Sequence, residues 1–128
     1  MCIRDSLYSL LESRAELDLQ VIIGNHDSLK ARHKIQLPLN WYSDIVEPPF
    51  VFHHEPLPDE RGYVLAGHIH PVWQLSAGKR NRITAPVFWF QEHIAVLPSF
   101  GLFTGGFRVR RQHNDRLFMV GKDCVIEV

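Results

Sequence analysis

The chain has 128 residues, of which 45% are hydrophobic and 22% are charged, and this is enough for one domain with one core. Basic and acidic residues number 14 each, which excludes the overall basic field typical of many nucleic-acid-binding proteins. Two cysteines, Cys2 and Cys124, are too few for a disulfide framework, and charges in the first twenty residues exclude a signal peptide. Since no apolar run is long enough to span a membrane, we expect a cytoplasmic protein.

Residues 1–6 show no periodicity, and we expect them to be a non-native leader that precedes a single domain at residues 7–128. Apolar residues then recur at helical spacing and predict an amphipathic helix that begins at Leu7 and continues through Leu10, Leu11 and Ala15. The apolar run Leu19–Ile23 predicts a buried strand, which ends at Gly24 and the polar residues after it. The order is therefore helix, strand and polar loop.

The rest of the chain reads as short strands joined by turns. Residues 28–41 have little periodicity and predict mostly loop, and residues 98–106, rich in glycine and aromatic residues, predict a long loop. The two turns before and after residues 85–90 are short enough for antiparallel pairing. The predicted strands are Ile45–Val46, Phe50–Phe52, Tyr63–Ala66, Val72–Leu75, Ala85–Phe90, His93–Leu97, Leu117–Val120 and Cys124–Val128, the last two forming a hairpin.

Two histidines separated by one residue occur in the stretch Gly67-His68-Ile69-His70-Pro71, directly after a predicted strand. In an extended segment, side chains two positions apart point to the same face, so His68 and His70 can present two imidazoles to one place. This arrangement favours a metal site. The alternative is a chance pair in a surface loop.

Polar side chains follow three predicted strands in the same way: Asn25 and His26, then His53 and His54, then the His68 and His70 pair. Imidazole nitrogens together with amide or carboxylate oxygens suit manganese, iron or zinc better than calcium or magnesium. Neighbouring residues on a strand face opposite ways, so His53 and His54 cannot both enter one metal site without distortion. The alternative is that these are loop histidines of a chain with eight histidines.

These three blocks, Gly24-Asn25-His26-Asp27, His54 and Gly67-His68-Ile69-His70, resemble in order the later signature blocks of the calcineurin-like metallophosphoesterase superfamily. One branch is more similar still, the bacterial ligase-associated DNA-damage-response endonucleases. The stretches that carry this second resemblance are His54-Glu55-Pro56, Phe88-Trp89-Phe90, Leu97-Pro98-Ser99-Phe100-Gly101 and Phe103-Thr104-Gly105-Gly106.

The resemblance implies an α/β fold, the C-terminal portion of a four-layer α-β-β-α sandwich with mixed sheets. It implies a phosphodiesterase or nuclease acting on DNA, with two divalent ions, manganese first and iron or zinc as alternatives, and hydroxide attack on phosphorus. By the same resemblance Asn25, His54 and His68 bind one metal, His70 binds the other, and His26 is the general acid. It also implies association with DNA ligase or helicase repair machinery.

Asp27 has two readings, as a carboxylate that orients the His26 imidazole or as the N-cap of a following turn. The superfamily's earlier Asp-x-His and Gly-Asp blocks occur nowhere in the 128 residues, so we expect a chain that is the C-terminal part of a longer enzyme and inactive by itself.

Two alternatives to the nuclease follow from the sequence. The first is a phosphoesterase acting on a small molecule such as a nucleotide or sugar diphosphate, which the zero net charge permits. The second is a catalytically silent fragment that binds a metal or a partner. Salt dependence should separate nucleic acid from small substrates, because the basic residues 108–111 lie in a segment, 78–116, with seven bases and two acids. We expect three histidines outside the blocks, His33, His93 and His113, to be surface or packing residues.

Overall fold

The computed structural model describes residues 9, 12–14, 16–28, 39–76, 78, 81–101 and 105–128. The predicted leader and most of the predicted helix, including Leu7, Leu10, Leu11 and Ala15, lie outside these residues, although Ser9, Glu12 and Ser13 are helical. The strands within the described residues are β1 (Gln20–Ile22), β2 (Asn40–Tyr42), β3 (Ile45–Glu47), β4 (Phe50–His53), β5 (Tyr63–Ala66), β6 (Pro71–Ser76), β7 (Arg82–Phe90), β8 (Ile94–Val96), β9 (Phe107–Arg108), β10 (Arg116–Val120) and β11 (Val125–Glu127).

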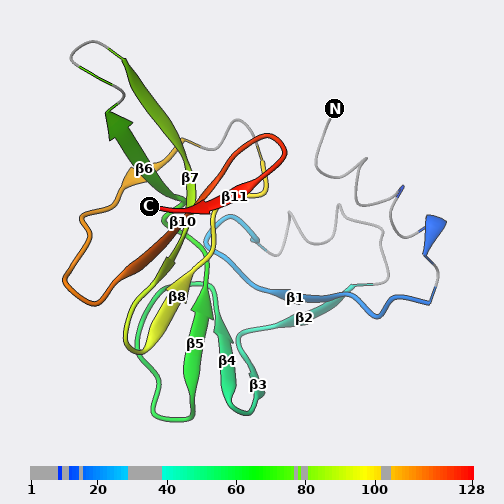
Figure 1. Cartoon of the computed structure of the whole chain (residues 1–128). Coiled ribbons are helices and arrows are strands. Elements are labelled where there is room, and N and C mark those ends of the chain that lie inside the picture. Colours follow the sequence, from blue (N-terminus) through cyan, green and yellow to red (C-terminus); the bar gives the residue numbers. More distant parts are fainter. Residues whose placement is uncertain are drawn as a thin grey trace.

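The strands form two sheets, a small parallel pair of β1 and β2 and a larger mixed sheet (Figure 1). The larger sheet has the order β11-β10-β7-β8-β5-β4-β3, in which β4, β5 and β8 are parallel and the other neighbours are antiparallel. The strand β6 also pairs with β7, and β9 lies parallel to β6. Parallel and antiparallel strand pairs therefore occur together, as predicted for mixed sheets.

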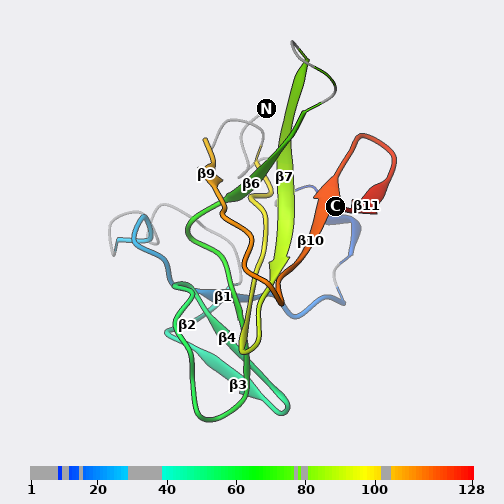
Figure 2. The same ribbon diagram turned by 60° about the vertical axis from the view of Figure 1, so that its left-hand side comes forward.

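The nine-residue strand β7 joins two parts of this sheet. Its first half, Arg82–Pro86, pairs with β6, and its second half pairs with β10 and β8. Figure 2 shows the hairpin of β6 and β7 extending away from the end of the molecule where β3 and β4 lie.

Two apolar clusters form the core. One gathers buried residues of β4, β5 and β8, namely Val51, Val64, Ala66, Ile94 and Val96. The other gathers Val87, Val109, Leu117 and Met119 around β7 and β10. Trp89 packs against both clusters, and its indole Nε1–H donates a 2.8 Å hydrogen bond to the carboxylate of Asp115. Asp115, only 5% exposed, therefore ties the loop before β10 to the middle of the core.

Replacing Asp115 with alanine should lower the free energy of unfolding by about 2 kcal/mol, because two donors lose their acceptor. These donors are the Trp89 indole N–H and the Gln112 backbone N–H, which lies 2.8 Å from the same carboxylate oxygen. Urea unfolding followed by tryptophan fluorescence measures the loss. Asp115→Asn, which keeps an acceptor oxygen, is the matched control, and equal losses in the two variants would contradict this account.

Each strand predicted from the sequence is present, with β7 beginning three residues earlier than predicted. Two strands were not predicted. The loop predicted for residues 28–41 was wrong at its end, where β2 begins at Asn40, and β9 was missed altogether. No helix in the described part of the chain is long and apolar enough to cross a membrane.

Candidate metal centre

The ends of three strands meet at one place. Strands β4 and β5 are parallel with His53 opposite Ala66, so the residues that follow them, His54 and Gly67, are neighbours. The Gly67 backbone N–H donates a 3.2 Å hydrogen bond to the His54 carbonyl oxygen. Strand β1, from the smaller sheet, brings Gly24 against the imidazole of His54. The fold therefore gathers the polar residues that follow β1, β4 and β5.

Three of the predicted ligand residues are in contact around the Nε2 atom of His54. The Oδ1 atom of Asn25 lies 3.1 Å from this nitrogen, and the Nδ1 atom of His68 lies 2.9 Å from it. The two imidazole rings meet edge to face at an angle of 71°, with their centroids 4.7 Å apart. One amide oxygen and two ring nitrogens thus converge from three separate strand ends.

No single two-centre hydrogen bond satisfies both contacts of His54 Nε2. If this nitrogen carries a proton, it can donate to Asn25 Oδ1, but it then has no lone pair for His68 Nδ1. If it is unprotonated, it can accept from His68 Nδ1–H but faces the lone pairs of the Asn25 oxygen. Exchanging the oxygen and nitrogen of the amide leaves two donors at a single lone pair. A cation bound among three lone pairs removes this conflict.

The distances also fit metal ligation. Donor atoms that lie about 2.0–2.1 Å from a common metal are separated by about 2.9–3.4 Å in octahedral or tetrahedral arrangements. The two measured separations, 2.9 and 3.1 Å, fall in that interval. Among the described residues no group of three His, Cys, Asp or Glu side chains could hold a metal, so the amide of Asn25 is essential to this donor set. The residues present fit one transition-metal ion.

Gly24 is required at its position because the His54 imidazole packs directly on its backbone. A Cβ atom at residue 24 would lie 2.6 Å from Cε1 and 2.8 Å from Nδ1 of His54, closer than real contacts allow. Gly67 has no such constraint, since a Cβ there would meet open space. The glycine before Asn25 therefore sets the position of the His54 ring.

The Gly24–Asp27 segment is a tight turn closed by two hydrogen bonds. The Asp27 backbone N–H donates to the Gly24 carbonyl oxygen at 3.0 Å, and the Gly24 N–H donates to the Asp27 carboxylate at 2.8 Å. The Asp27 side chain thus fixes the loop that carries Asn25, a role that neither sequence reading of Asp27 included. His26, at the tip of the turn, is exposed.

The Gly67–His70 segment is not extended, which corrects the geometry expected for the histidine pair. His68 and His70 have φ angles of 69° and 51°, a left-handed conformation that is uncommon for residues with a side chain and costs of order 1–3 kcal/mol. The Ile69 N–H donates to the Gly67 carbonyl at 2.9 Å, and the Phe107 N–H donates to the His70 carbonyl at 3.0 Å. Such strain is concentrated at functional sites, and strand alternation does not describe how these two imidazoles are presented.

The environment of His54 favours its neutral imidazole, which is the form that binds metal. Burial lowers the pKa of His54, and the neighbouring His68 lowers it further. The carboxylates of Asp27 and Glu55 act in the opposite direction and offset only part of this effect.

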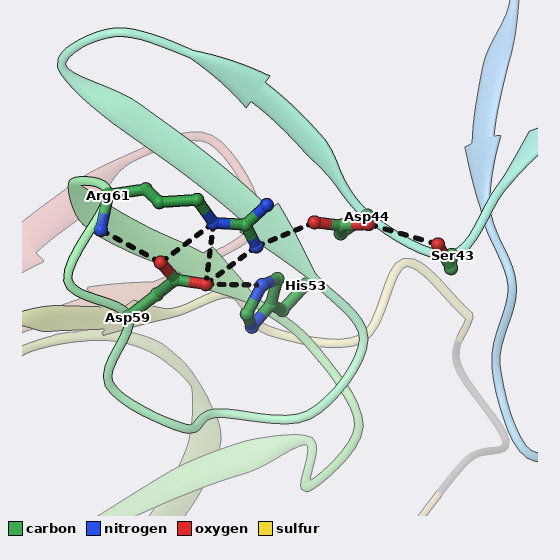
Figure 3. Close-up of polar contacts among 5 residues, drawn as sticks. All are labelled: Ser43, Asp44, His53, Asp59 and Arg61. Atoms are coloured by element: carbon green, nitrogen blue, oxygen red, sulfur yellow. Dashed lines mark hydrogen bonds and ion pairs between the residues drawn. The ribbon is translucent and has the colours of Figure 1, made fainter.

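His53 points to a different set of partners (Figure 3). Its Nε2 atom lies 3.2 Å from the carboxylate of Asp59. The guanidinium of Arg61 joins Asp59 to Asp44, with nitrogen–oxygen distances of 2.7 and 2.6 Å. His53, the last residue of β4, therefore contacts this ion-pair cluster, whereas His54, the next residue, contacts Asn25; both histidines line the same groove.

The cluster of Asp44, His53, Asp59 and Arg61 was not identified from the sequence. The signal was the run of acids between residues 44 and 60, which ends immediately before Arg61. An open groove of about 520 Å³ runs from this cluster to two of the predicted ligands, and its lining includes Asn25, His54, Asp44 and Arg61. A molecule bound in this groove beside Asn25 and His54 would also lie near Arg61 and Asp44.

In the unchanged chain, hydrogen bonds from Arg61 hold the pKa of Asp59 below its ordinary value of 3.8. Replacing Arg61 with glutamine should therefore raise this pKa towards 3.8. Asp44 should follow in the same direction. The stabilisation from Arg61 is complete above pH 3.8 and is lost as the pH falls through the lowered pKa values. NMR titration of the carboxyl carbons measures the shift. Unchanged midpoints, or an equal shift in Arg82→Gln, would contradict the assignment.

Two of the three histidines predicted to be surface or packing residues, His93 and His113, are exposed. His93 lies 3.8 Å from the Glu92 carboxylate, and the Nδ1 atom of His113 lies 2.8 Å from the Asn114 amide oxygen. Neither lines the groove that contains Asn25 and His54. His33 and Phe103 lie outside the described residues.

Comparison with solved structures finds a similarity that extends over almost the whole chain. The chain superposes on the crystal structure of the Pseudomonas putida nuclease MPE with a TM-score of 0.77 and 30% sequence identity. The match covers 97% of this chain and 60% of the nuclease chain, so the chain spans about three fifths of that structure. No protein-family model and no curated protein matches the sequence. The chain therefore has the α/β fold with mixed sheets seen in this nuclease, although it contains little helix in its described part.

Proposed function

We propose that this chain carries part of the active site of a metal-dependent phosphodiesterase, a nuclease that acts on DNA. The observation that supports the proposal is the convergence of Asn25 Oδ1, His54 Nε2 and His68 Nδ1 at three strand ends. The fold on which they converge is shared with a nuclease at 30% identity. The closer relation to ligase-associated endonucleases rests on sequence blocks such as Gly67-His68-Ile69-His70-Pro71 and belongs to the same proposal.

In this proposal Asn25, His54 and His68 hold one divalent ion, and His70 contributes to a second. Bound divalent ions, manganese in the first place, supply positive charge to the phosphoryl oxygens and lower the pKa of the attacking water. Iron and zinc are the alternatives that the same donors would accept. The chain contributes a single candidate ligand, His70, to the second ion, so a complete dinuclear centre needs further carboxylate and imidazole ligands.

His26 is the proposed general acid. It follows Asn25 directly and stands exposed at the tip of the turn that Asp27 closes onto Gly24. In this proposal the His26 imidazole protonates the oxygen that leaves phosphorus, while the Asn25 side chain binds the metal. Histidine is the side chain that most often serves as a general acid.

The test is hydrolysis in the presence of Mn²⁺ by a protein that combines this chain with the Asp-x-His and Gly-Asp blocks. We expect cleavage of both bis(p-nitrophenyl) phosphate and DNA, and we expect His26→Ala to slow cleavage of DNA more than that of the small ester. The nitrophenolate leaving group needs little protonation, because it is a much weaker base than a nucleotide alkoxide. Failure to hydrolyse either substrate would overturn the proposal.

A second candidate is that the isolated chain binds metal without catalysis. In the described part of the chain, the donor set offers three groups to one ion but no carboxylate to bridge to another, which favours this candidate. The sequence also contains no Asp-x-His block. Turnover by the purified 128-residue chain that disappears in His68→Ala would exclude this candidate.

A further inference from the structure

A second depression shares no lining residue with the groove that contains Asn25 and His54. It has a volume of about 480 Å³ and is lined by Trp73, Arg108, Val109 and Arg110. This volume is within the range of small-ligand sites. Its lining within the described part of the chain contains two arginines and no carboxylate.

The arginines between residues 108 and 111 do not share one role. Arg111 is used structurally, because its guanidinium donates to the carbonyl oxygens of Asp115 and Val128 at 3.1 and 2.8 Å. Arg108 and Arg110 are exposed, and neither contacts a carboxylate among residues that the structure describes. Two positive charges are therefore available to an anion from solution.

The fold places these charges beside the metal ligands. Strand β9 runs parallel to β6 with Phe107 opposite Pro71 and Arg108 opposite Val72, which is two residues beyond His70. The Phe107 N–H donates a 3.0 Å hydrogen bond to the His70 carbonyl oxygen, so Arg108 follows directly after a residue that contacts the His70 backbone.

Trp73 gives the depression an apolar wall. One side of the residue packs on the core cluster that contains Val87 and Leu117, so the indole is held in place. An aromatic wall between guanidinium groups suits a ligand that alternates charged phosphates with flat or apolar groups. A nucleic acid strand has this composition, whereas a free inorganic anion would leave the indole unused.

We propose that Arg108 and Arg110 bind backbone phosphates of a nucleic acid strand that extends from the metal centre, with Trp73 against a sugar or base. The choice of ligand rests on the proposed nuclease function. Such contacts are independent of sequence and depend on salt, because each neutralised phosphate of a single strand releases about 0.7 of a counterion. The subsite holds the strand but takes no part in the bond cleavage.

The test measures binding of a fluorescein-labelled dT20 strand to the 128-residue chain by fluorescence anisotropy, with EDTA present so that metal has no part. In Arg108→Ala/Arg110→Ala we expect affinity to fall about tenfold and the slope of log affinity against log salt to fall by about 1.4. The matched control, Arg82→Ala/Lys122→Ala, removes two exposed charges elsewhere and should stay within about twofold. Arg108→Lys/Arg110→Lys, which keeps both charges, should retain the slope.

Equal losses in the two alanine pairs, or no loss in either, would overturn the subsite. Absence of binding by the unchanged chain would also overturn it. Hydrolysis of bis(p-nitrophenyl) phosphate by the protein that combines this chain with the Asp-x-His and Gly-Asp blocks separates this inference from the proposed function, because that ester is too small to reach the subsite. If the ester is cleaved normally while dT20 affinity is unchanged in Arg108→Ala/Arg110→Ala, the subsite is wrong and the proposed function stands. If the ester is not cleaved but dT20 binding depends on the two arginines, the subsite stands and the proposed function is wrong.

Discussion

Replacing His54 with alanine should lower the affinity of the chain for a divalent transition metal by at least about 100-fold. Groups that merely support a ligand change affinity by about 10–100-fold, and His54 is itself the group that both other donors contact. Competition with a chromophoric chelator measures the affinity for Zn²⁺ or Mn²⁺.

The matched control is His53→Ala, a change of the same type one residue earlier. His53 contacts Asp59 and belongs to the cluster with Arg61, so its loss should leave metal affinity within about twofold. Equal effects of the two substitutions would contradict the assignment of His54, as would an unchanged affinity in His54→Ala.

Replacing Gly24 with alanine should weaken metal binding by about 10–100-fold although it removes no donor atom. The new Cβ would lie 2.6 Å from the His54 ring, so the ring must move away from Asn25. The side chain that moves is His54, a proposed ligand at the end of β4. Its displacement separates its Nε2 atom from the donor atoms of Asn25 and His68, so the three can no longer bind one ion.

Gly67→Ala is the control for this prediction, because its Cβ meets open space and the φ angle there is not left-handed. It should leave metal affinity and the free energy of unfolding almost unchanged. A Gly24→Ala chain that binds metal as well as Gly67→Ala would show that the imidazole of His54 need not lie where the structure has it.

The gathering of Asn25, His54 and His68 followed from sequence because each comes directly after an apolar run that forms a strand. Two of the strands, β4 and β5, are parallel neighbours, so their carboxyl ends lie at the same edge. Apolar periodicity is a local property of the chain, and the buried residues of β4 and β5 show it. The strand predicted at Leu19–Ile23 is present as β1, but none of its residues is buried, so the prediction of a buried strand was wrong.

Strands β2 and β9 could not be predicted in the same way. They have three and two residues, and each exists because a distant strand offers hydrogen bonds, β1 in one case and β6 in the other. The left-handed backbone of His68 and His70 was also hidden, since residues with side chains rarely adopt it and no glycine marks the position. The contact of Arg61 with Asp44 spans 17 residues, and it depends on how β3 and β4 pair.

The most direct test of the metal centre is to identify the ring nitrogens that bind the ion. The structure predicts Nε2 for His54 and Nδ1 for His68, an unequal pair that chance binding to surface histidines would not reproduce. Long-range ¹H–¹⁵N correlation spectra of the chain, recorded during titration with Zn²⁺, distinguish the two nitrogens of every ring. We predict that the first equivalent shifts His54 Nε2 and His68 Nδ1 together. Coordination through the opposite nitrogens, or first at His53, His93 or His113, would contradict the account.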